Sequence, residues 1–168
     1  MSFSEIMDMY TEPLIRIAYY YTKNLQTAED IVQEVFIKFH QTSHRYHEQG
    51  EMSAYLSRCT INRSKDYLKS WHARKLHFQQ RWLQPTKENL LQDLVKADEQ
   101  SLVATAIMQL PIKYREVLVY YYFEEMSITQ IAILLQLPDS TVKTRMRRAK
   151  ELMKQKLDTI EWEVLLHE

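Results

Sequence analysis

The side chains best suited to chemistry lie in a basic segment near the C-terminus. Residues 143–156 carry seven basic residues and one acidic residue. Apolar residues recur here at spacings of 4, 3 and 4, which predicts a helix with one buried stripe and cationic remaining faces. The stripe consists of Val142, Met146, Ala149 and Met153. Guanidinium groups on such a helix can bind guanine or phosphate in the major groove of DNA. The alternative is an ordinary helix with a solvated basic face.

The residues before this basic helix predict the element that positions it. Apolar residues at helical spacing indicate a short helix over residues 127–135, and a three-residue turn then ends at Pro138. Proline suits the first turn of a second helix, where its missing N–H is harmless. N–H groups at this helix start can face a phosphate. The pattern predicts a helix-turn-helix, with a plain helical hairpin as the alternative. We expect the side-chain cap of the second helix to come from Asp139, Ser140 or Thr141.

A second basic patch lies in the middle of the chain. Residues 51–83 carry seven basic and two acidic residues, although the whole chain has 22 of each. Two cationic patches in an otherwise acidic chain indicate contact with a polyanion at two places, unless each is only a solvated helix face. A stand-alone helix-turn-helix regulator has no need of a second DNA-facing patch, whereas a protein that binds a promoter at two places requires one. The second patch therefore distinguishes these two classes of DNA-binding protein.

Helical periodicity dominates the N-terminal half. Ser2 with Glu5 predicts a capping box at the start of a first helix, within which Pro13 predicts a kink or a break. Thr27 with Asp30 predicts the cap of a second helix, after a turn at Asn24, Leu25 and Gln26. A third helical run then extends over about residues 51–82.

The C-terminal half predicts a second helical set over residues 99–109, 112–124, 127–135 and 138–156. The stretch 117–123 (VLVYYYF) has strand propensity, but a lone strand would have no partner. The predicted fold class is therefore all-α, with two small helical domains joined by a linker and a helix-turn-helix in the second. The predicted boundaries are 1–83 for the first domain, 84–98 for the linker and 99–168 for the second domain with its acidic tail.

The scarcity of glycine and cysteine excludes whole classes of site. The chain has one glycine, whereas phosphate-cradling loops, dinucleotide fingerprints and nucleophile elbows need several. Its one cysteine excludes a disulfide framework and a Cys-type zinc site, and suits a reducing cytoplasm. No apolar stretch of about 18 residues and no signal-peptide charge pattern is present. We expect a cytoplasmic protein without membrane insertion.

The remaining reactive residues do not form a recognisable active site. His40, His44 and His47 share one helix face by spacing, which is a possible metal arrangement, but solvated histidines near a loop are the interpretation we favour. Cys59 lacks a recognisable base and is expected to be a small packed residue. We therefore expect no enzyme activity, no metal and no cofactor.

Three segments in order along the chain resemble one protein family. Residues 110–157 (LPIKYREVLVYYYFEEMSITQIAILLQLPDSTVKTRMRRAKELMKQKL) resemble region 4 of bacterial sigma factors of the extracytoplasmic-function (ECF) group. Residues 28–40 (AEDIVQEVFIKFH) resemble their region 2.2, and residues 54–70 (AYLSRCTINRSKDYLKS) their regions 2.3 and 2.4. Three collinear motifs are far more specific than any one of them.

The resemblance implies roles for individual residues. In the family, region 2.2 binds the clamp helices of the RNA polymerase β′ subunit, and the matching residues are Asp30, Gln33 and Glu34. An asparagine of region 2.3 lines the pocket for a base flipped out of the −10 element, and Asn62 matches it, since an amide offers both a donor and an acceptor. Phosphate contacts beside Asn62 would come from Arg58, Arg63, Lys65 and Lys69. The positions matched to readout of the −35 element are Thr141, Lys143, Thr144, Arg147 and Arg148.

Some positions remain ambiguous or depart from the family. Tyr67 and Trp71 can stack on bases of the opened strand or belong to the core. The family commonly has glycine at the positions of Gln136 and Ser140, and tryptophan at that of Tyr55. If Gln136 keeps a positive φ, it costs about 1 kcal/mol relative to glycine; otherwise the angle between the two helices changes.

The function implied by the resemblance is that of an ECF-type sigma factor. Such a protein binds core RNA polymerase through the β′ clamp helices and the β flap, recognises −10 and −35 promoter DNA and promotes strand opening. An anti-sigma factor is expected as a further partner by family analogy alone. The alternative is a stand-alone helix-turn-helix regulator whose N-terminal helices serve dimerisation or sensing. A helical adaptor without a DNA role would leave both basic patches unexplained.

Overall fold

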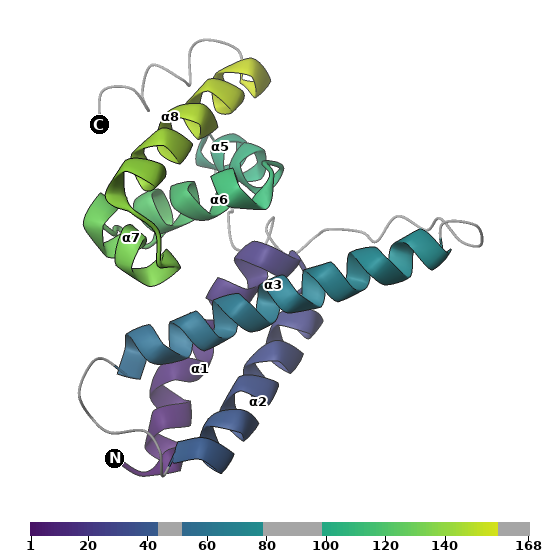
Figure 1. Ribbon diagram of the computed structural model, residues 1–168, viewed down its shortest axis with the longest axis vertical. Coiled ribbons are helices and arrows are strands. Elements are labelled where there is room, and N and C mark those ends of the chain that lie inside the picture. The colour runs from purple at the N-terminus through teal and green to yellow at the C-terminus, as the bar shows by residue number, and fades with distance from the viewer. Residues whose placement is uncertain (44–51, 79–98, 158–168) are drawn as a thin grey trace. The chain divides into compact units, whose positions relative to one another are not determined.

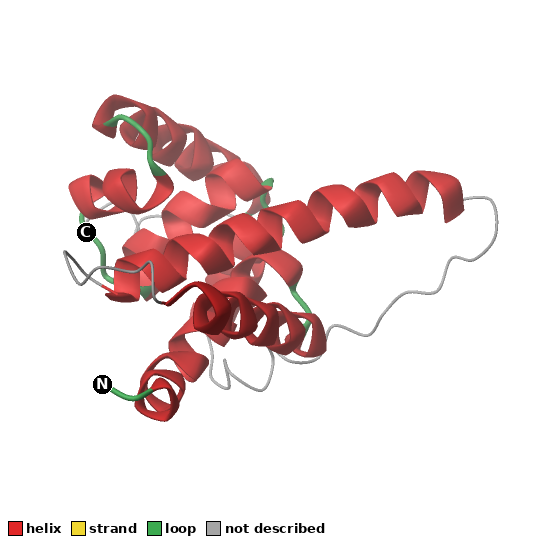
Figure 2. Ribbon diagram, turned by 60° about the horizontal axis from the view of Figure 1, so that its bottom comes forward, coloured by secondary structure: helices red, strands yellow, loops and turns green. Residues whose placement is uncertain are grey.

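The computed structural model describes residues 1–43, 52–78 and 99–157, and these residues form helices and short turns without a strand (Figures 1 and 2). The chain divides into two compact units, Met1–Glu88 and Asn89–Glu168. The all-α prediction is therefore confirmed. The first unit contains α1 (Phe3–Thr22), α2 (Leu25–Thr42) and α3 (Met52–Phe78); the second contains α5 (Glu99–Met108), α6 (Ile112–Leu118), the π-helix η2 (Val119–Phe123), α7 (Ile128–Leu135) and α8 (Asp139–Lys156). The predicted linker, residues 84–98, lies outside the described residues.

The first helix begins as its sequence predicts but does not break at Pro13. Ser2 and Glu5 form a capping box, in which Glu5 Oε2 accepts a hydrogen bond from the Ser2 N–H at 2.6 Å. This backbone bond, and the bond from the Ser2 side chain, lower the pKa of Glu5. Of the kink or break predicted at Pro13, the break does not occur, because α1 is continuous through this residue. Leu14 and Ile17 are buried just beyond the proline, and this packing offsets the missing backbone hydrogen bond.

The second helix begins three residues earlier than predicted. Lys23 ends α1 in the left-handed region at φ 55°, and the extended Asn24 is then the N-cap of α2. Asn24 Oδ1 accepts a hydrogen bond from the Thr27 N–H at 2.9 Å. Thr27 is thus a capped residue within the helix rather than its cap, and the turn predicted at residues 24–26 is reduced to the two residues Lys23 and Asn24.

The core of the first unit lies where α1, α2 and α3 pack against one another, with α3 crossing the other two helices (Figure 1). Two hydroxyl groups are buried in this core, on Thr60 and Ser64 of α3. Each hydroxyl donates to the carbonyl oxygen four residues earlier, at 2.9 Å and 2.7 Å, so neither is left unsatisfied. The small side chains at these two positions leave room for close packing of α3. The apolar residues of α2 and α3 in this core are Ala28, Ile31, Val32, Val35, Phe36, Phe39, Leu56 and Ile61.

In the second unit, the helix predicted over residues 112–124 changes its geometry halfway. The chain leaves the α-helix after Leu118 and forms the π-helix η2, in which the Glu124 N–H reaches the Val119 carbonyl at 3.2 Å. Val119 and Tyr120 are buried there. The prediction of a helix instead of a strand is confirmed, but its continuous α-helical form is not.

Candidate nucleic-acid interface

The residues predicted to form a helix-turn-helix do so, and α8 presents its cations outward. Val142, Met146, Ala149 and Met153 are buried, as the spacing predicted. On the remaining faces of α8, the structure places four of the predicted contact residues at the surface: Lys143, Thr144, Arg147 and Arg148. Thr141 is half-buried. Helix α7 and the turn before Pro138 hold α8 against the rest of the unit.

The turn between α7 and α8 keeps the conformation that glycine would favour. Gln136 has φ 56° and ψ 47°, the left-handed region, and the Leu137 N–H reaches back to the Ala132 carbonyl at 2.9 Å. The turn therefore has the geometry typical of a glycine helix cap despite the glutamine. At the N-terminus of α7, Ser127 and Gln130 form a second capping box. This capping box was not predicted, although a serine followed three residues later by a glutamine is a signal for it.

The predicted side-chain cap of α8 is absent. The N-cap is Pro138, which makes no side-chain cap bond, and the carboxylate of Asp139 is used elsewhere. Asp139 Oδ2 accepts a hydrogen bond from the Thr129 hydroxyl of α7 at 3.0 Å. This bond joins the first turns of α7 and α8, so Asp139 ties the two helices together instead of capping its own helix. Within the first turn of α8, the Thr141 N–H donates to the Pro138 carbonyl at 3.0 Å, so the backbone itself satisfies this donor.

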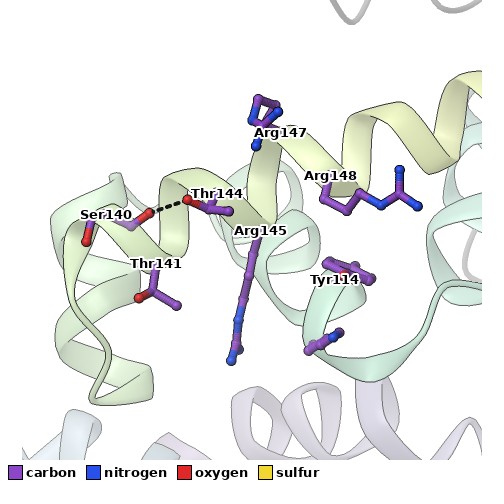
Figure 3. A pocket seen from close by; sticks show the side chains of 8 residues that line it. Tyr114, Ser140, Thr141, Thr144, Arg145, Arg147 and Arg148 are labelled. Atoms are coloured by element: carbon purple, nitrogen blue, oxygen red, sulfur yellow. Dashed lines mark hydrogen bonds between the residues drawn. The ribbon is translucent and has the colours of Figure 1, made fainter.

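A groove of about 480 Å³ runs between α8 and the start of α6 (Figure 3). Its cationic lining comes from two elements, and none of the described residues that line it is acidic. The lining residues are Lys113, Tyr114, Ser140, Thr141, Thr144, Arg145, Arg147 and Arg148. Lys113 and Tyr114 belong to α6 and were not predicted as site residues. The ammonium group of Lys113 lies 4.9 Å from the centre of the Tyr114 ring, an arrangement in which the cation is attracted to the ring face.

Two side chains of α8 are already engaged within the unit. The Thr144 hydroxyl donates to the Ser140 carbonyl at 2.9 Å, so toward a ligand it offers only its acceptor lone pairs and its methyl group. Arg145 Nη1 lies 3.4 Å from Oε1 of Glu116, whose side chain is 3% exposed. Figure 3 shows Arg145 pointing to the side of α8 opposite Arg147. Arg145 thus neutralises a buried carboxylate of α6 and ties α8 to it.

Glu151 neutralises part of the exposed cationic face. Its carboxylate lies 2.9 Å from Arg148 Nη1 and 3.6 Å from Arg147 Nη1. The hydrogen bond with Glu151 raises the pKa of Arg148. Both arginines remain at least half exposed, so a phosphate can compete with Glu151 for them.

In the first unit, α3 carries the residues predicted to bind at the −10 element. Asn62 and Lys69 are exposed, and their spacing of seven places them on one face of the helix. Lys65 lies on the same face, with its ammonium group 5.8 Å from the ring centre of Tyr21. Arg58 differs from these, because its Nε is buried and has no hydrogen-bond partner among the described residues.

The two aromatic residues of α3 whose role was left open differ in exposure. Tyr67 is half-buried, and Trp71 is 42% exposed beside the ring of His72. Trp71 is thus the more accessible of the two for stacking.

The predicted polymerase-binding residues form an exposed polar face on α2. Asp30, Gln33 and Glu34 are all exposed, and their spacings of three and four place them on one side of the helix. Glu34 also contacts α3, where its Oε2 accepts a hydrogen bond from Arg63 Nε at 2.5 Å. The structure therefore brings together one residue predicted to bind polymerase and one predicted to bind DNA.

Within the described parts of the chain, no group of three or more His, Cys, Asp or Glu side chains is placed to hold a metal ion; His44 and His47 lie outside these parts. Cys59 is a half-buried free thiol, as expected for a packed residue. No helix in the described ranges has the length and apolar character needed to cross a membrane.

Two family models match the chain in the order in which its units occur. Sigma-70 region 2 matches residues 6–74, which span α1 and α2 and most of α3. Sigma-70, region 4 matches residues 100–153, which include the helix-turn-helix. A stand-alone helix-turn-helix regulator would not account for the first match.

Relatives and solved structures agree with these matches. The ECF RNA polymerase sigma factor SigW of Bacillus subtilis is 27% identical over 166 residues, covering 93% of this chain and 89% of SigW. The ECF sigma factor SigM of the same organism is 26% identical over 155 residues, covering 92% of this chain and 94% of SigM. The sigma factor RpoE of Bartonella quintana, solved in complex with the anti-sigma factor NepR, has a similar fold, with a TM-score of 0.67, 16% identity and coverage of 94% of this chain and 98% of RpoE. CnrH, solved with the cytosolic domain of CnrY, has a TM-score of 0.64, 20% identity and coverage of 94% and 88%. With both regions matched in order, and sigma factors of this group aligned over more than nine-tenths of the chain, this protein belongs to the extracytoplasmic-function sigma factors of RNA polymerase.

Proposed function

We propose that the two units hold one promoter at two places, with α8 at the −35 element and α3 at the −10 element. The observation that carries this proposal is the position of the cations on α8. Lys143, Arg147 and Arg148 are exposed opposite a buried apolar stripe, on the second helix of a helix-turn-helix. In this motif the second helix enters the major groove, and the helix before it crosses the phosphate backbone.

At the −35 element, base and phosphate contacts divide between two elements. Lys143, together with the donors of Arg147 and Arg148 that Glu151 does not hold, can bind guanine edges or phosphates. Thr141 and Thr144 add short polar contacts near the start of α8. Lys113, across the groove on α6, adds a cation that suits a backbone phosphate and fixes the register of α8 in the groove. A base contact changes specificity, whereas a phosphate contact changes affinity for all sequences equally.

At the −10 element, the binding energy of α3 opens the duplex. The exposed amide of Asn62 holds a flipped base, and Arg63, Lys65 and Lys69 bind phosphates beside it. Unstacking a base costs a few kcal/mol, which these contacts offset without a chemical step. We assign Arg58 to the same site, where the exposed part of its guanidinium binds a phosphate while its Nε stays buried. The chain itself catalyses no reaction.

The partners follow from the two faces that remain. The face of Asp30, Gln33 and Glu34 binds the clamp helices of the polymerase β′ subunit, and the second unit rests on the β flap. Acidic and amide side chains on one exposed helix face suit a basic partner surface. We also propose a cytoplasmic location and an anti-sigma factor that covers one or both DNA faces. RpoE and CnrH, which share the fold, were each solved with another protein bound.

Transcription in vitro tests this function. Core RNA polymerase is assayed on promoter templates with and without the purified chain, and the chain is expected to confer specific initiation. The double variant R147Q/R148Q is expected to lower initiation at −35-dependent promoters at least tenfold while still binding core polymerase. Its matched control is K154Q/K156Q, which removes two charges from the last turn of the same helix. Equal loss in both variants would contradict the assignment of α8, and no initiation with the parent chain would contradict the function.

A further inference from the structure

One ion pair joins two surfaces that the proposed function assigns to different partners. Arg63 Nε of α3 donates to Glu34 Oε2 of α2 at 2.5 Å, across 29 positions of sequence. Glu34 lies on the polymerase-binding face and Arg63 on the −10 face. Resting on the proposed function, we propose that this pair masks Arg63 in the free chain, and that binding of polymerase to Glu34 releases Arg63 for a DNA phosphate.

The pair is placed where two partners can compete for it. The side chain of Arg63 is 38% exposed and that of Glu34 is 52% exposed, so a cation of a partner can reach Glu34 and a phosphate can reach Arg63. When the Glu34 carboxylate accepts hydrogen bonds from an Arg or Lys of a partner, its interaction with Arg63 becomes weaker. A guanidinium left without its carboxylate binds phosphate in its place, because both anions fit the same fork of donors.

Opening the pair does not require α2 and α3 to separate. The two helices are held together by the buried apolar core, in which Phe36 and Phe39 of α2 and Leu56 and Ile61 of α3 are 5% exposed or less. A surface pair adds little to such a core. Breaking it therefore changes the charge available on α3 without changing the fold.

The released cation would appear beside the residue assigned to base capture. Arg63 is the immediate neighbour of Asn62, which is exposed. A phosphate held by Arg63 lies on the flank of α3 that faces α2, about 100° around the helix from the Asn62 amide. Binding of polymerase and binding of DNA are then coupled, and by thermodynamic linkage each must strengthen the other by the same factor.

The size of the coupling is bounded by the exposure of the pair. Breaking an exposed ion pair of this kind changes the affinity for a competing partner by only about 1.4- to 5-fold. DNA is therefore expected to bind the complex with polymerase slightly more tightly than it binds the free chain. This difference in affinity becomes smaller at high salt.

The first arm of the test measures DNA binding by the free chain. Fluorescence anisotropy with a short, labelled single-stranded DNA is recorded for the parent, E34Q, R63Q and the double variant. E34Q is expected to bind about 1.4- to 5-fold more tightly than the parent, and this gain should vanish in the R63Q background. E12Q is the matched control, since it removes an exposed carboxylate from α1 of the same unit. An equal gain in E12Q, or a gain that persists without Arg63, would show a general charge effect and overturn the proposal.

The second arm measures binding to immobilised core RNA polymerase. R63Q frees Glu34 and is expected to bind about two- to fivefold more tightly than the parent, but to have no effect in the E34Q background. R74Q, which removes another exposed cation of α3, is the control and should leave polymerase binding unchanged. Unchanged or weaker binding by R63Q would overturn the masking. If D30N and E34Q both bind polymerase as the parent does, the proposed docking face fails, while the DNA arm still decides whether Glu34 masks Arg63.

Discussion

Replacing Gln136 with glycine tests whether the helix-turn-helix carries backbone strain at its turn. Gln136 is held at φ 56° and ψ 47°, where a Cβ atom crowds the backbone. Its side chain is exposed and no hydrogen bond of the cap involves it, since the cap bonds run from backbone N–H groups to the carbonyls of Ala132 and Ile133. Q136G therefore removes the Cβ and leaves the cap in place.

The magnitude follows from two opposing effects. Relief of the left-handed strain stabilises the folded chain by about 1–2 kcal/mol. The greater freedom of glycine in the unfolded chain offsets about 0.4–1 kcal/mol of this gain. We expect a net stabilisation of about 0.5–1 kcal/mol, which raises the Tm of a unit of this size by roughly 2–8 °C.

Differential scanning calorimetry of the full chain measures this shift, and amide hydrogen exchange over α7 and α8 assigns it to the second unit. Q136A is the matched control, because it shortens the side chain but keeps the Cβ, and it should remain within about 0.5 kcal/mol of the parent. If Q136G and Q136A have the same Tm, the strain argument is refuted.

Three other perturbations test separate parts of the account. N62A should reduce open-complex formation on duplex promoters at least tenfold and lose discrimination among −10 variants, as measured by permanganate footprinting; unchanged opening would remove Asn62 from the site. E151Q should strengthen binding of −35 duplex DNA about two- to fivefold and steepen its salt dependence, because Arg147 and Arg148 lose their internal partner; anisotropy titrations at several salt concentrations measure both. The carboxylate of Glu5 has a folded pKa below its ordinary value of 4.5, so it stabilises the chain above that pH, and the stabilisation is lost as the pH falls through the folded pKa. The Tm difference between the parent and E5Q should therefore be largest near neutral pH and vanish in acid, and a difference independent of pH would contradict the capping box.

Much of this fold could be predicted because helical spacing and local caps are properties of neighbouring residues. The buried stripe of α8 and the capping box at Ser2 each involve residues within a few turns, and both are confirmed. The errors concern competition between local signals. Asn24 and Thr27 are both good caps, and the left-handed Lys23 decides between them by ending α1 just before Asn24. Asp139 is also of a residue type that caps helices well, but its carboxylate instead accepts a hydrogen bond from the Thr129 hydroxyl of the preceding helix.

The candidate site shows where sequence reasoning ends. Lys113 and Tyr114 face α8 only because α6 packs against it, and no spacing relates residues of two different helices. The contact between Glu34 and Arg63 has the same origin, since it depends on how α2 lies against α3. Composition could indicate two cationic patches, but not that particular carboxylates of this chain already hold Arg63, Arg147 and Arg148.

Site-specific photocrosslinking in the complex with core polymerase tests whether α8 and α3 bind two elements of one promoter. A photoreactive amino acid is placed at Thr144 on α8 or at Asn62 on α3, and the crosslinked positions on one promoter are mapped. We expect Thr144 to crosslink to the −35 element and Asn62 to the −10 element of the same DNA molecule. Crosslinks from both positions to a single element, or none from α8 in a transcriptionally active complex, would contradict this expectation.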